Sequence, residues 1–252
     1  MTVVAPLVHH EQPARWVQDL EAVPLPRQRT DGEVQVRSGV LYGSFSCPWS
    51  YLASQRTDRI PAAVLRPAWR MIDPDVAPGT RLAAPGPQRD ALGAERAAAD
   101  LEAVRELLLP GEHLPARPPA LVPHTGPAVV GYAEAVGAGV GDRVRRLLFD
   151  AYWLHGADIG LPDVLRRILQ APLRAGSSSS TPVREYGYAV TLTGGPITTD
   201  AHLRVRAWHA GWRATSADAL PALTVDTTTT SGPAALTALT ARLGPHPAAT
   251  PP

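Results

Sequence analysis

The chain contains no lysine and no asparagine, and cysteine occurs only once, at Cys47. A single cysteine excludes an intramolecular disulfide, and with it the disulfide framework that stabilises many small secreted domains. Without lysine, all 24 basic residues are arginine, and they nearly balance 23 acidic residues. The formal net charge of +1 gives no electrostatic reason to expect nucleic acid or a membrane surface as a partner.

Long apolar runs are absent too, and no uninterrupted stretch is long enough to span a membrane as a helix. Residues 1–16 lack the basic start and apolar core of a secretory signal. With the single cysteine, these features predict a cytoplasmic protein. There is no phosphate-binding glycine loop and no set of spaced metal ligands, so we expect neither a metal nor a tightly bound cofactor.

The most informative stretch that is present surrounds the cysteine, at 44–53 (SFSCPWSYLA). The apolar run 40–42 predicts a strand that leads into it, and a helical segment follows at 51–60. Cys47 then lies at the amino end of a helix, where unpaired backbone N–H groups and the helix dipole favour a negative charge. A cysteine in that position tends to have a lowered pKa, and the thiolate is its reactive form. Pro48 suits the first helical turn because it has no N–H to leave unpaired.

A lone cysteine in a cytosolic protein is more often a small buried apolar residue. The order strand, Cys-Pro, helix favours a reactive thiol instead. Ser50 occupies the position where a Cys-x-x-Cys motif has its second cysteine. Any disulfide of Cys47 must therefore join it to a small thiol or to another protein.

The remaining patterns predict an α/β domain interrupted by helices. Strands are predicted at 34–42, 63–72, 220–226 and 227–230, and helices at 51–60, 88–109, 128–136, 140–155, 161–170, 200–213 and 233–243. The order is β-α-β, then several helices, then helix-β-β-α. A helical block is thus inserted in the middle of the α/β domain.

The run 45–52 resembles the active-site turn of the DsbA-like branch of the thioredoxin fold. Cys47-Pro48-Trp49 is similar to the Cys-Pro-Trp-Cys-Tyr form of the members related to FrnE. The following 50–53 (SYLA) is similar to the Ser-Pro-Tyr-Ser-Tyr/Trp-Leu form of kappa-class glutathione transferases and 2-hydroxychromene-2-carboxylate isomerases.

Three further stretches fit the same branch. Residues 65–74 resemble the strand and loop after the first helix, and 148–165 resemble the late part of the helical insertion. Residues 220–223 (LPAL) resemble the cis-proline strand that faces the active-site turn.

The resemblance implies a thioredoxin-like fold with a helical insertion domain between its βαβ half and its C-terminal ββα half. We expect the following parts: a flexible N-terminal extension at 1–36, a thioredoxin-like domain at 37–75 and 200–244, a helical insertion domain at 86–172, a Ser-rich linker of uncertain structure at 173–199, and a disordered tail at 245–252.

The resemblance also implies the site residues. Pro221 is expected to be cis and to leave backbone groups beside Cys47 free to pair with an extended substrate or a thiol tripeptide. Cys47, Ser50 and Pro221 are the expected catalytic residues. The expected substrate- or thiol-binding residues are Pro48, Trp49, Tyr51, Leu220 and Ala222. For Trp49 and Tyr51, packing is an equal alternative.

Three functions remain open. The first is a monothiol thiol-disulfide oxidoreductase or thiol transferase, in which Ser50 and the helix N-terminus stabilise the Cys47 thiolate and an external thiol, glutathione or mycothiol, resolves its mixed disulfide. The second is a thiol-dependent isomerase or transferase of the kappa-class type, in which position 47 donates a hydrogen bond to the thiolate of a bound cofactor. The third is a binding or accessory protein without catalysis. The expected partner is a small thiol or disulfide, without nucleic acid or membrane, and the oligomeric state stays open.

Overall fold

The computed structural model describes residues 39–61, 63–73 and 84–243. The predicted extension at 1–36 and tail at 245–252 lie outside the described residues. All described residues belong to one of the two units of the chain, residues 36–252.

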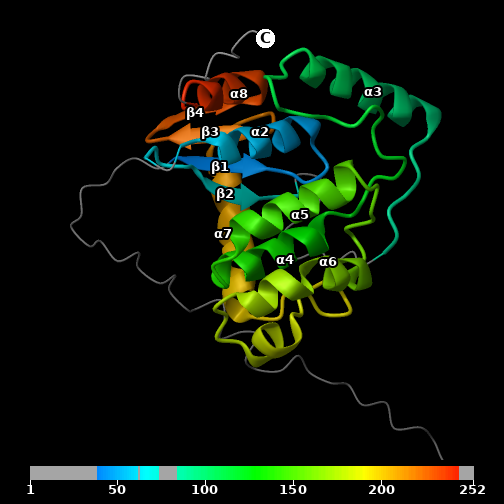
Figure 1. Cartoon of the computed structure of the whole chain (residues 1–252), viewed down its shortest axis with the longest axis vertical. Helices are drawn as coiled ribbons and strands as arrows, with labels where there is room; N and C mark the ends of the chain where they lie inside the picture. Colours follow the sequence, from blue (N-terminus) through cyan, green and yellow to red (C-terminus); the bar gives the residue numbers. More distant parts are fainter. Residues whose placement is uncertain (1–38, 62, 74–83, 244–252) are drawn as a thin grey trace, which may run out of the picture. The chain divides into compact units, whose positions relative to one another are not determined.

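A four-stranded mixed sheet forms the centre of this unit, with the strand order β2-β1-β3-β4 (Figure 1). The strands are β1 (Val40–Gly43), β2 (Ala68–Met71), β3 (Ala222–Val225) and β4 (Thr228–Ser231). β2 runs parallel to β1, whereas β3 is antiparallel to both β1 and β4. The predicted thioredoxin-like arrangement of a βαβ half and a ββα half is confirmed.

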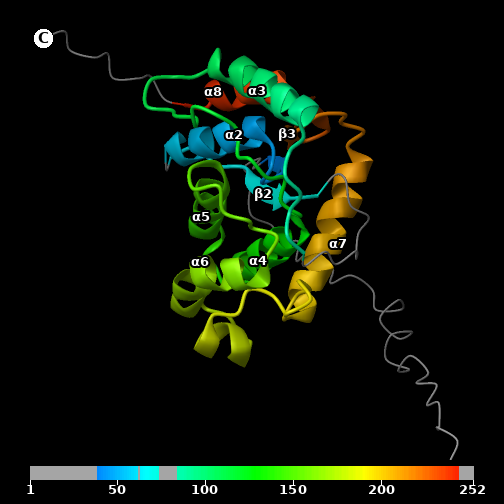
Figure 2. The ribbon, with the colours of Figure 1, turned by 90° about the vertical axis from the view of Figure 1, so that its right-hand side faces the viewer.

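The two faces of the sheet are covered by helices from distant parts of the chain. Helices α2 (Pro48–Arg59) and α8 (Gly232–Thr240) pack together on one face. Successive residues of a strand point to opposite faces, and Tyr42 of β1 points toward α7 (Thr199–Ala214), where its ring lies 5.8 Å from that of Trp212. Figure 2 shows α7 running from the sheet to the inserted helices.

The inserted block comprises α3 (Ala91–Arg105), α4 (Gly126–Gly137), α5 (Gly141–Trp153) and α6 (Pro162–Ala175). α4 packs against α5, α6 and α7, whereas α3 lies against α2 in the other half (Figure 2). The inserted helices therefore contact the thioredoxin-like part through α3 and α5, which lie against α2, and through α4, which packs against α7.

The segment predicted as a Ser-rich linker, 173–199, contains ordered structure. Its first residues continue α6 to Ala175, and a short π-helical turn, η1, follows at Pro182–Tyr186. Val183, Ala189 and Val190 are buried in the core, so apolar side chains fix this segment against the inserted helices.

Strand β2 is shorter than the predicted strand at 63–72, because only Ala68–Met71 pair with β1. Pro67 precedes the first paired residue. A proline has no N–H for a sheet ladder and commonly occurs at the start of a strand, which explains where the pairing begins.

Two buried arginines fix the C-terminal half of α2. Arg56 donates hydrogen bonds to both carboxylate oxygens of Glu112, at 3.0 and 3.2 Å, and further bonds to α8. Arg145 of α5 binds Asp58 at 2.5 Å and also bonds Ser54. Buried charges of this kind are tolerated only when they are paired, and here the pairs hold α2 to three other parts of the fold.

Candidate functional site

The cysteine lies where the sequence predicts, at the junction of β1 and α2. Cys47 is the N-cap residue of α2, with extended backbone angles (φ −92°, ψ 121°), and Pro48 occupies the first turn. The backbone N–H of Cys47 donates to the carbonyl of Ser44 at 3.2 Å, which closes the turn between strand and helix. The buried Ser50 hydroxyl accepts a hydrogen bond from the Ser44 N–H at 3.2 Å.

Across from the thiol lies the Leu220–Pro221 peptide, which is cis. The Cys47 S–H donates to the Leu220 carbonyl with an Sγ–O distance of 3.7 Å. The neighbouring Pro221 carbonyl is occupied by the N–H of Gly232, at 2.8 Å. The structure thus brings together Cys47, Ser50 and Leu220–Pro221 from segments about 170 residues apart.

The lowered pKa expected for Cys47 is wrong. Burial raises the pKa of the Cys47 thiol, and it outweighs the Ser50 hydroxyl and the backbone N–H groups of Ser50 and Trp49, which lower it. The charge of Asp100 on α3 raises it further. The half-buried sulfur also makes no capping hydrogen bond to the helix. The resting group is therefore a protonated thiol that donates to Leu220.

A cavity of about 220 Å³ adjoins the thiol turn. Ser46 and Pro48 form one wall, Trp153 of α5 forms another, and the wall opposite belongs to the start of α3. Trp153 also fixes the turn, since its indole N–H donates to the Phe45 carbonyl at 3.0 Å. The helical insertion therefore both holds the cysteine turn in place and encloses the space beside it.

The charged residues of this cavity escaped the sequence reasoning. Arg89, Arg96 and Asp100 line it from the segment around α3. Charged side chains on a helix usually face solvent, so their positions in the sequence carried no signal of a site. Only the packing of α3 against α2 brings them to the thiol.

Several predicted binding residues take other positions. Tyr51 is 1% exposed, and its hydroxyl contacts His113 and Asp150 at 3.1 and 3.4 Å. Its ring stacks on Trp153 with an interplanar angle of 6°. These contacts support the packing alternative for Tyr51. Ala222 is buried and its backbone pairs within the sheet, whereas Trp49 and Leu220 are partly buried at the edge of the core.

Two features that would suggest other chemistry do not occur in the described part of the chain. Its histidine, cysteine, aspartate and glutamate side chains form no group of three or more that would hold a metal ion. None of its helices combines the length and the apolar character needed to cross a bilayer.

No protein-family model matches the sequence, and no curated protein matches it either. Solved structures that are similar to this chain include two with a TM-score above 0.5. The first is a "putative protein disulfide isomerase" from Nitrosomonas europaea, with 17% identity and a TM-score of 0.54 over 82% of this chain and 96% of that one. The second is the selenomethionine form of 2-hydroxychromene-2-carboxylate isomerase, with 16% identity and a TM-score of 0.51 over 81% of this chain and 92% of that one.

At these identities the likeness establishes the fold and leaves the reaction open. Both structures align over nearly their whole length, so the likeness includes the helical insertion as well as the sheet. The chain therefore has a thioredoxin-like fold with a helical insertion, the fold of the DsbA-like proteins that the sequence around Cys47 resembles.

Proposed function

We propose that this protein is a monothiol thiol-disulfide oxidoreductase or thiol transferase that acts through Cys47. One observation carries the proposal: the Cys47 sulfur lies at the N-terminus of α2, 3.7 Å from the Leu220 carbonyl, and its neighbours Ser46 and Pro48 line a cavity of about 220 Å³. Catalytic cysteines occupy such partly exposed positions at helix termini.

The reaction has two steps. The Cys47 thiol gives its proton to solvent, and its sulfur attacks one sulfur of an incoming disulfide. The Cys47–substrate disulfide forms, and the other half of the disulfide leaves as a thiolate. The thiolate of a small external thiol then attacks the substrate sulfur of the mixed disulfide and releases the Cys47 thiolate, because Ser50 has no sulfur to do so.

The protein's own groups ease the first step. Burial disfavours the thiolate, but the Ser50 hydroxyl and the N–H groups of Trp49 and Ser50 favour it. As the thiol ionises it loses its bond to the Leu220 carbonyl. That carbonyl is then available to accept a backbone N–H of a peptide-like substrate.

The cavity charges suit a thiol that carries both signs of charge. Arg96 is exposed and extends from α3, while Arg89 is held by the Pro119 carbonyl and the Tyr152 hydroxyl at 3.0 and 3.1 Å. Arginines pair well with carboxylates, and Asp100 on the same wall suits an ammonium group. Glutathione has both groups, and we therefore favour it as the resolving thiol over the uncharged mycothiol.

The test is to incubate the full chain with glutathione disulfide and measure its intact mass. The proposal predicts a single glutathione adduct on Cys47, which disappears when reduced glutathione is added. The variant Ser50→Cys is a matched comparison, because it restores a second thiol and should release the adduct without external thiol. No adduct on the wild-type chain at any pH at which the thiolate forms would reject the proposal.

A second function is favoured by the protonated state of the thiol. A Cys47 S–H that already donates to a carbonyl can donate instead to the thiolate of a bound cofactor, which then acts as the nucleophile. This would make the chain a thiol-dependent isomerase or transferase. Cys47→Ser preserves a donor, so retained thiol-dependent activity and saturable binding of reduced glutathione in that variant would select this function. Failure of both chemistries in the wild-type chain would leave the binding or accessory role.

A further inference from the structure

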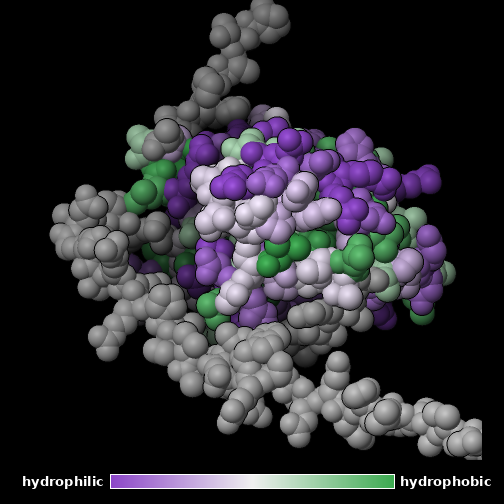
Figure 3. Space-filling view, turned by 90° about the horizontal axis from the view of Figure 1, so that it is seen from below, coloured by the Kyte–Doolittle hydropathy of each residue, from purple (hydrophilic) through white to green (hydrophobic). Residues whose placement is uncertain are grey.

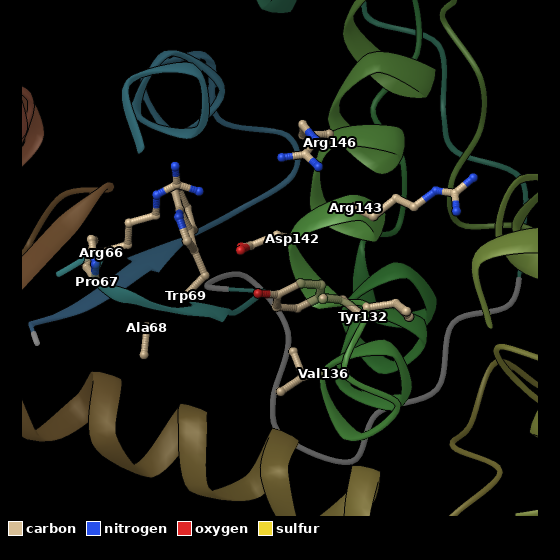
Figure 4. A pocket seen from close by; sticks show the side chains of 12 residues that line it. Arg66, Pro67, Ala68, Trp69, Tyr132, Val136, Asp142, Arg143 and Arg146 are labelled. Carbon is tan, nitrogen blue, oxygen red and sulfur yellow. The ribbon is translucent and has the colours of Figure 1, made fainter. Parts of the chain in front are cut away.

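A second and larger cavity, of about 620 Å³, lies between the start of β2 and the junction of α4 and α5. It shares no lining residue with the cavity beside Cys47. Figure 4 shows Trp69 on one side and Asp142 and Arg146 of α5 on the other, with Tyr132 of α4 below them. Its volume falls in the range of small-molecule sites and far exceeds the space that one water needs.

Its wall contains a buried donor without an acceptor. Trp69 is 6% exposed, and its indole N–H has no hydrogen-bond partner among the described residues. The guanidinium of Arg145 stacks on the Trp69 ring at 5.1 Å, and its Nε–H, also fully buried, likewise has no partner in that part of the chain. Buried polar groups are nearly always hydrogen-bonded, and leaving one unpaired is costly.

Tyr132 adds a third donor. The residue is 2% exposed, and its hydroxyl points into the space between Trp69 and Asp142 (Figure 4). The described residues offer this hydroxyl no hydrogen-bond acceptor at bonding distance. Burial is the largest cause of a raised Tyr132 pKa, so the hydroxyl stays protonated and remains a donor.

The charges around the cavity suit an anion. Arg66 and Arg146 line it, although both also have protein partners: Arg66 donates to the Ile60 carbonyl and Arg146 pairs with Asp58. The carboxylate of Asp142 also lines the cavity, and Arg145, which binds Asp58 more closely, lies 3.6 Å from it. The rest of the wall includes the apolar side chains of Pro67, Ala68, Val136 and Val140.

We infer that this cavity binds a small organic carboxylate, whose oxygens accept a hydrogen bond from the Tyr132 hydroxyl while its apolar body lies against Ala68 and Val136. A carboxylate offers acceptors alone, which suits the Tyr132 hydroxyl and the arginines of the wall. Arg146 at the rim adds attraction for the negative charge. The role inferred for this site is binding.

The inference extends beyond the thiol chemistry, since it needs neither Cys47 nor an external thiol. Trp69 of this cavity nevertheless lies close to the cysteine turn. A Cβ atom at Gly43 would come within 2.7 Å of the Trp69 ring and 3.3 Å of the Ser50 Oγ, so the tryptophan packs against the cysteine turn.

Benzoate is a suitable probe, because it joins a carboxylate to a flat apolar body. Its binding to the full chain is measured by ligand-detected NMR and by calorimetry. Tyr132→Phe removes one oxygen and preserves the packing, and loss of one hydrogen bond to a charged group should weaken binding about tenfold. No measurable binding of benzoate, or equal binding to wild type and Tyr132→Phe, would overturn the inference.

Two arginines of α5 provide a matched pair of variants. Arg146 points into the cavity, whereas the side chain of Arg143 points away from it (Figure 4). Arg146→Gln should weaken benzoate binding several-fold and Arg143→Gln should leave it unchanged. Inorganic phosphate serves as the comparison ligand. Binding of phosphate without binding of benzoate would show a site for inorganic anions and would contradict the proposed carboxylate with its apolar body.

Discussion

The two halves of helix α2 are held in opposite ways. In the C-terminal half, Arg56 makes five hydrogen bonds, to Glu112, to α8 and to the Leu107 carbonyl, and Asp58 binds Arg145. At the N-terminus, Cys47 makes one long S–H bond and is not capped. The fixed half positions the helix, and that allows the other end to present a group whose bonding is incomplete.

The contrast explains why a reactive group can exist here at small cost to folding. Unpaired groups at a helix terminus are ordinarily satisfied by caps or by water. At this terminus Pro48 removes one N–H, and Ser46 and Pro48 line a cavity beside the turn. In the view from below, which looks onto the side of α6 and η1, green apolar residues are interspersed with purple and white ones (Figure 3).

The largest expected effect concerns Cys47, at the N-terminal end of α2. Cys47→Ser should abolish adduct formation with glutathione disulfide, because serine is not nucleophilic toward disulfides under these conditions. The free energy of unfolding should change little, since the sulfur makes only one weak hydrogen bond. Intact mass and chemical denaturation check the two halves of this prediction. Retained adduct formation would place the chemistry elsewhere.

A variant in the C-terminal half of α2 should show the reverse pattern: a lower free energy of unfolding, with adduct formation retained. Arg56→Met removes the closest ion-pair partner of the Glu112 carboxylate, which is 0% exposed, and leaves it only the more distant Arg59, at 3.6 Å. Breaking a buried ion pair in this way costs about 3–5 kcal/mol. Denaturant unfolding measures the loss, and the folded fraction should still form the Cys47 adduct. The double variant Arg56→Met/Glu112→Leu should regain much of the stability, and a double variant no more stable than Arg56→Met would argue against this account.

A smaller effect, on the reactivity of Cys47, is expected from Ser50 in the first turn of α2. Ser50→Ala removes the hydroxyl that favours the Cys47 thiolate, so the pKa of Cys47 should rise further. Below that pKa, alkylation by iodoacetamide should slow about tenfold. Ser46→Ala is the matched control, since the Ser46 hydroxyl bonds that of Ser44 at 3.2 Å. Equal slowing by both variants would remove the specific role of Ser50.

The smallest effect on the reactivity of Cys47 is expected from Asp100 on α3, in the inserted block. Asp100→Asn removes an exposed negative charge that raises the pKa of Cys47. Because solvent and salt screen exposed charges, alkylation near pH 8 should speed up by only about twofold. Glu95→Gln, on the same helix, is the control and should have no effect. High salt should abolish the difference between Asp100→Asn and wild type, and a difference that persists in high salt would point to a structural change instead.

The sequence predicted those features that depend on neighbouring residues. Pro48 and the change of pattern after Tyr42 placed Cys47 at a strand–helix junction, and resemblance to a family directed attention to Pro221. The sheet and the inserted helices followed from the order of the elements, although Pro67 shortened β2.

What the sequence did not predict depends on packing between distant segments. The direction of the Cys47 pKa shift follows from burial by the surrounding chain, including α3 and the cis-proline segment, and local rules on helix termini cannot supply that cost. Arg89 and Arg96 resemble ordinary surface arginines until α3 packs on α2. Tyr132 becomes a candidate ligand donor only because α4, α5 and the start of β2 enclose a cavity around it.

The central claim is that Cys47 is a protonated thiol at rest, which reacts once it loses its proton. The most direct measurement is the rate of Cys47 alkylation as a function of pH on the native chain, followed by intact mass. The account predicts a rate that rises with pH to a midpoint above that of a free cysteine thiol. A midpoint well below that of a free thiol would show a resting thiolate and would contradict the account.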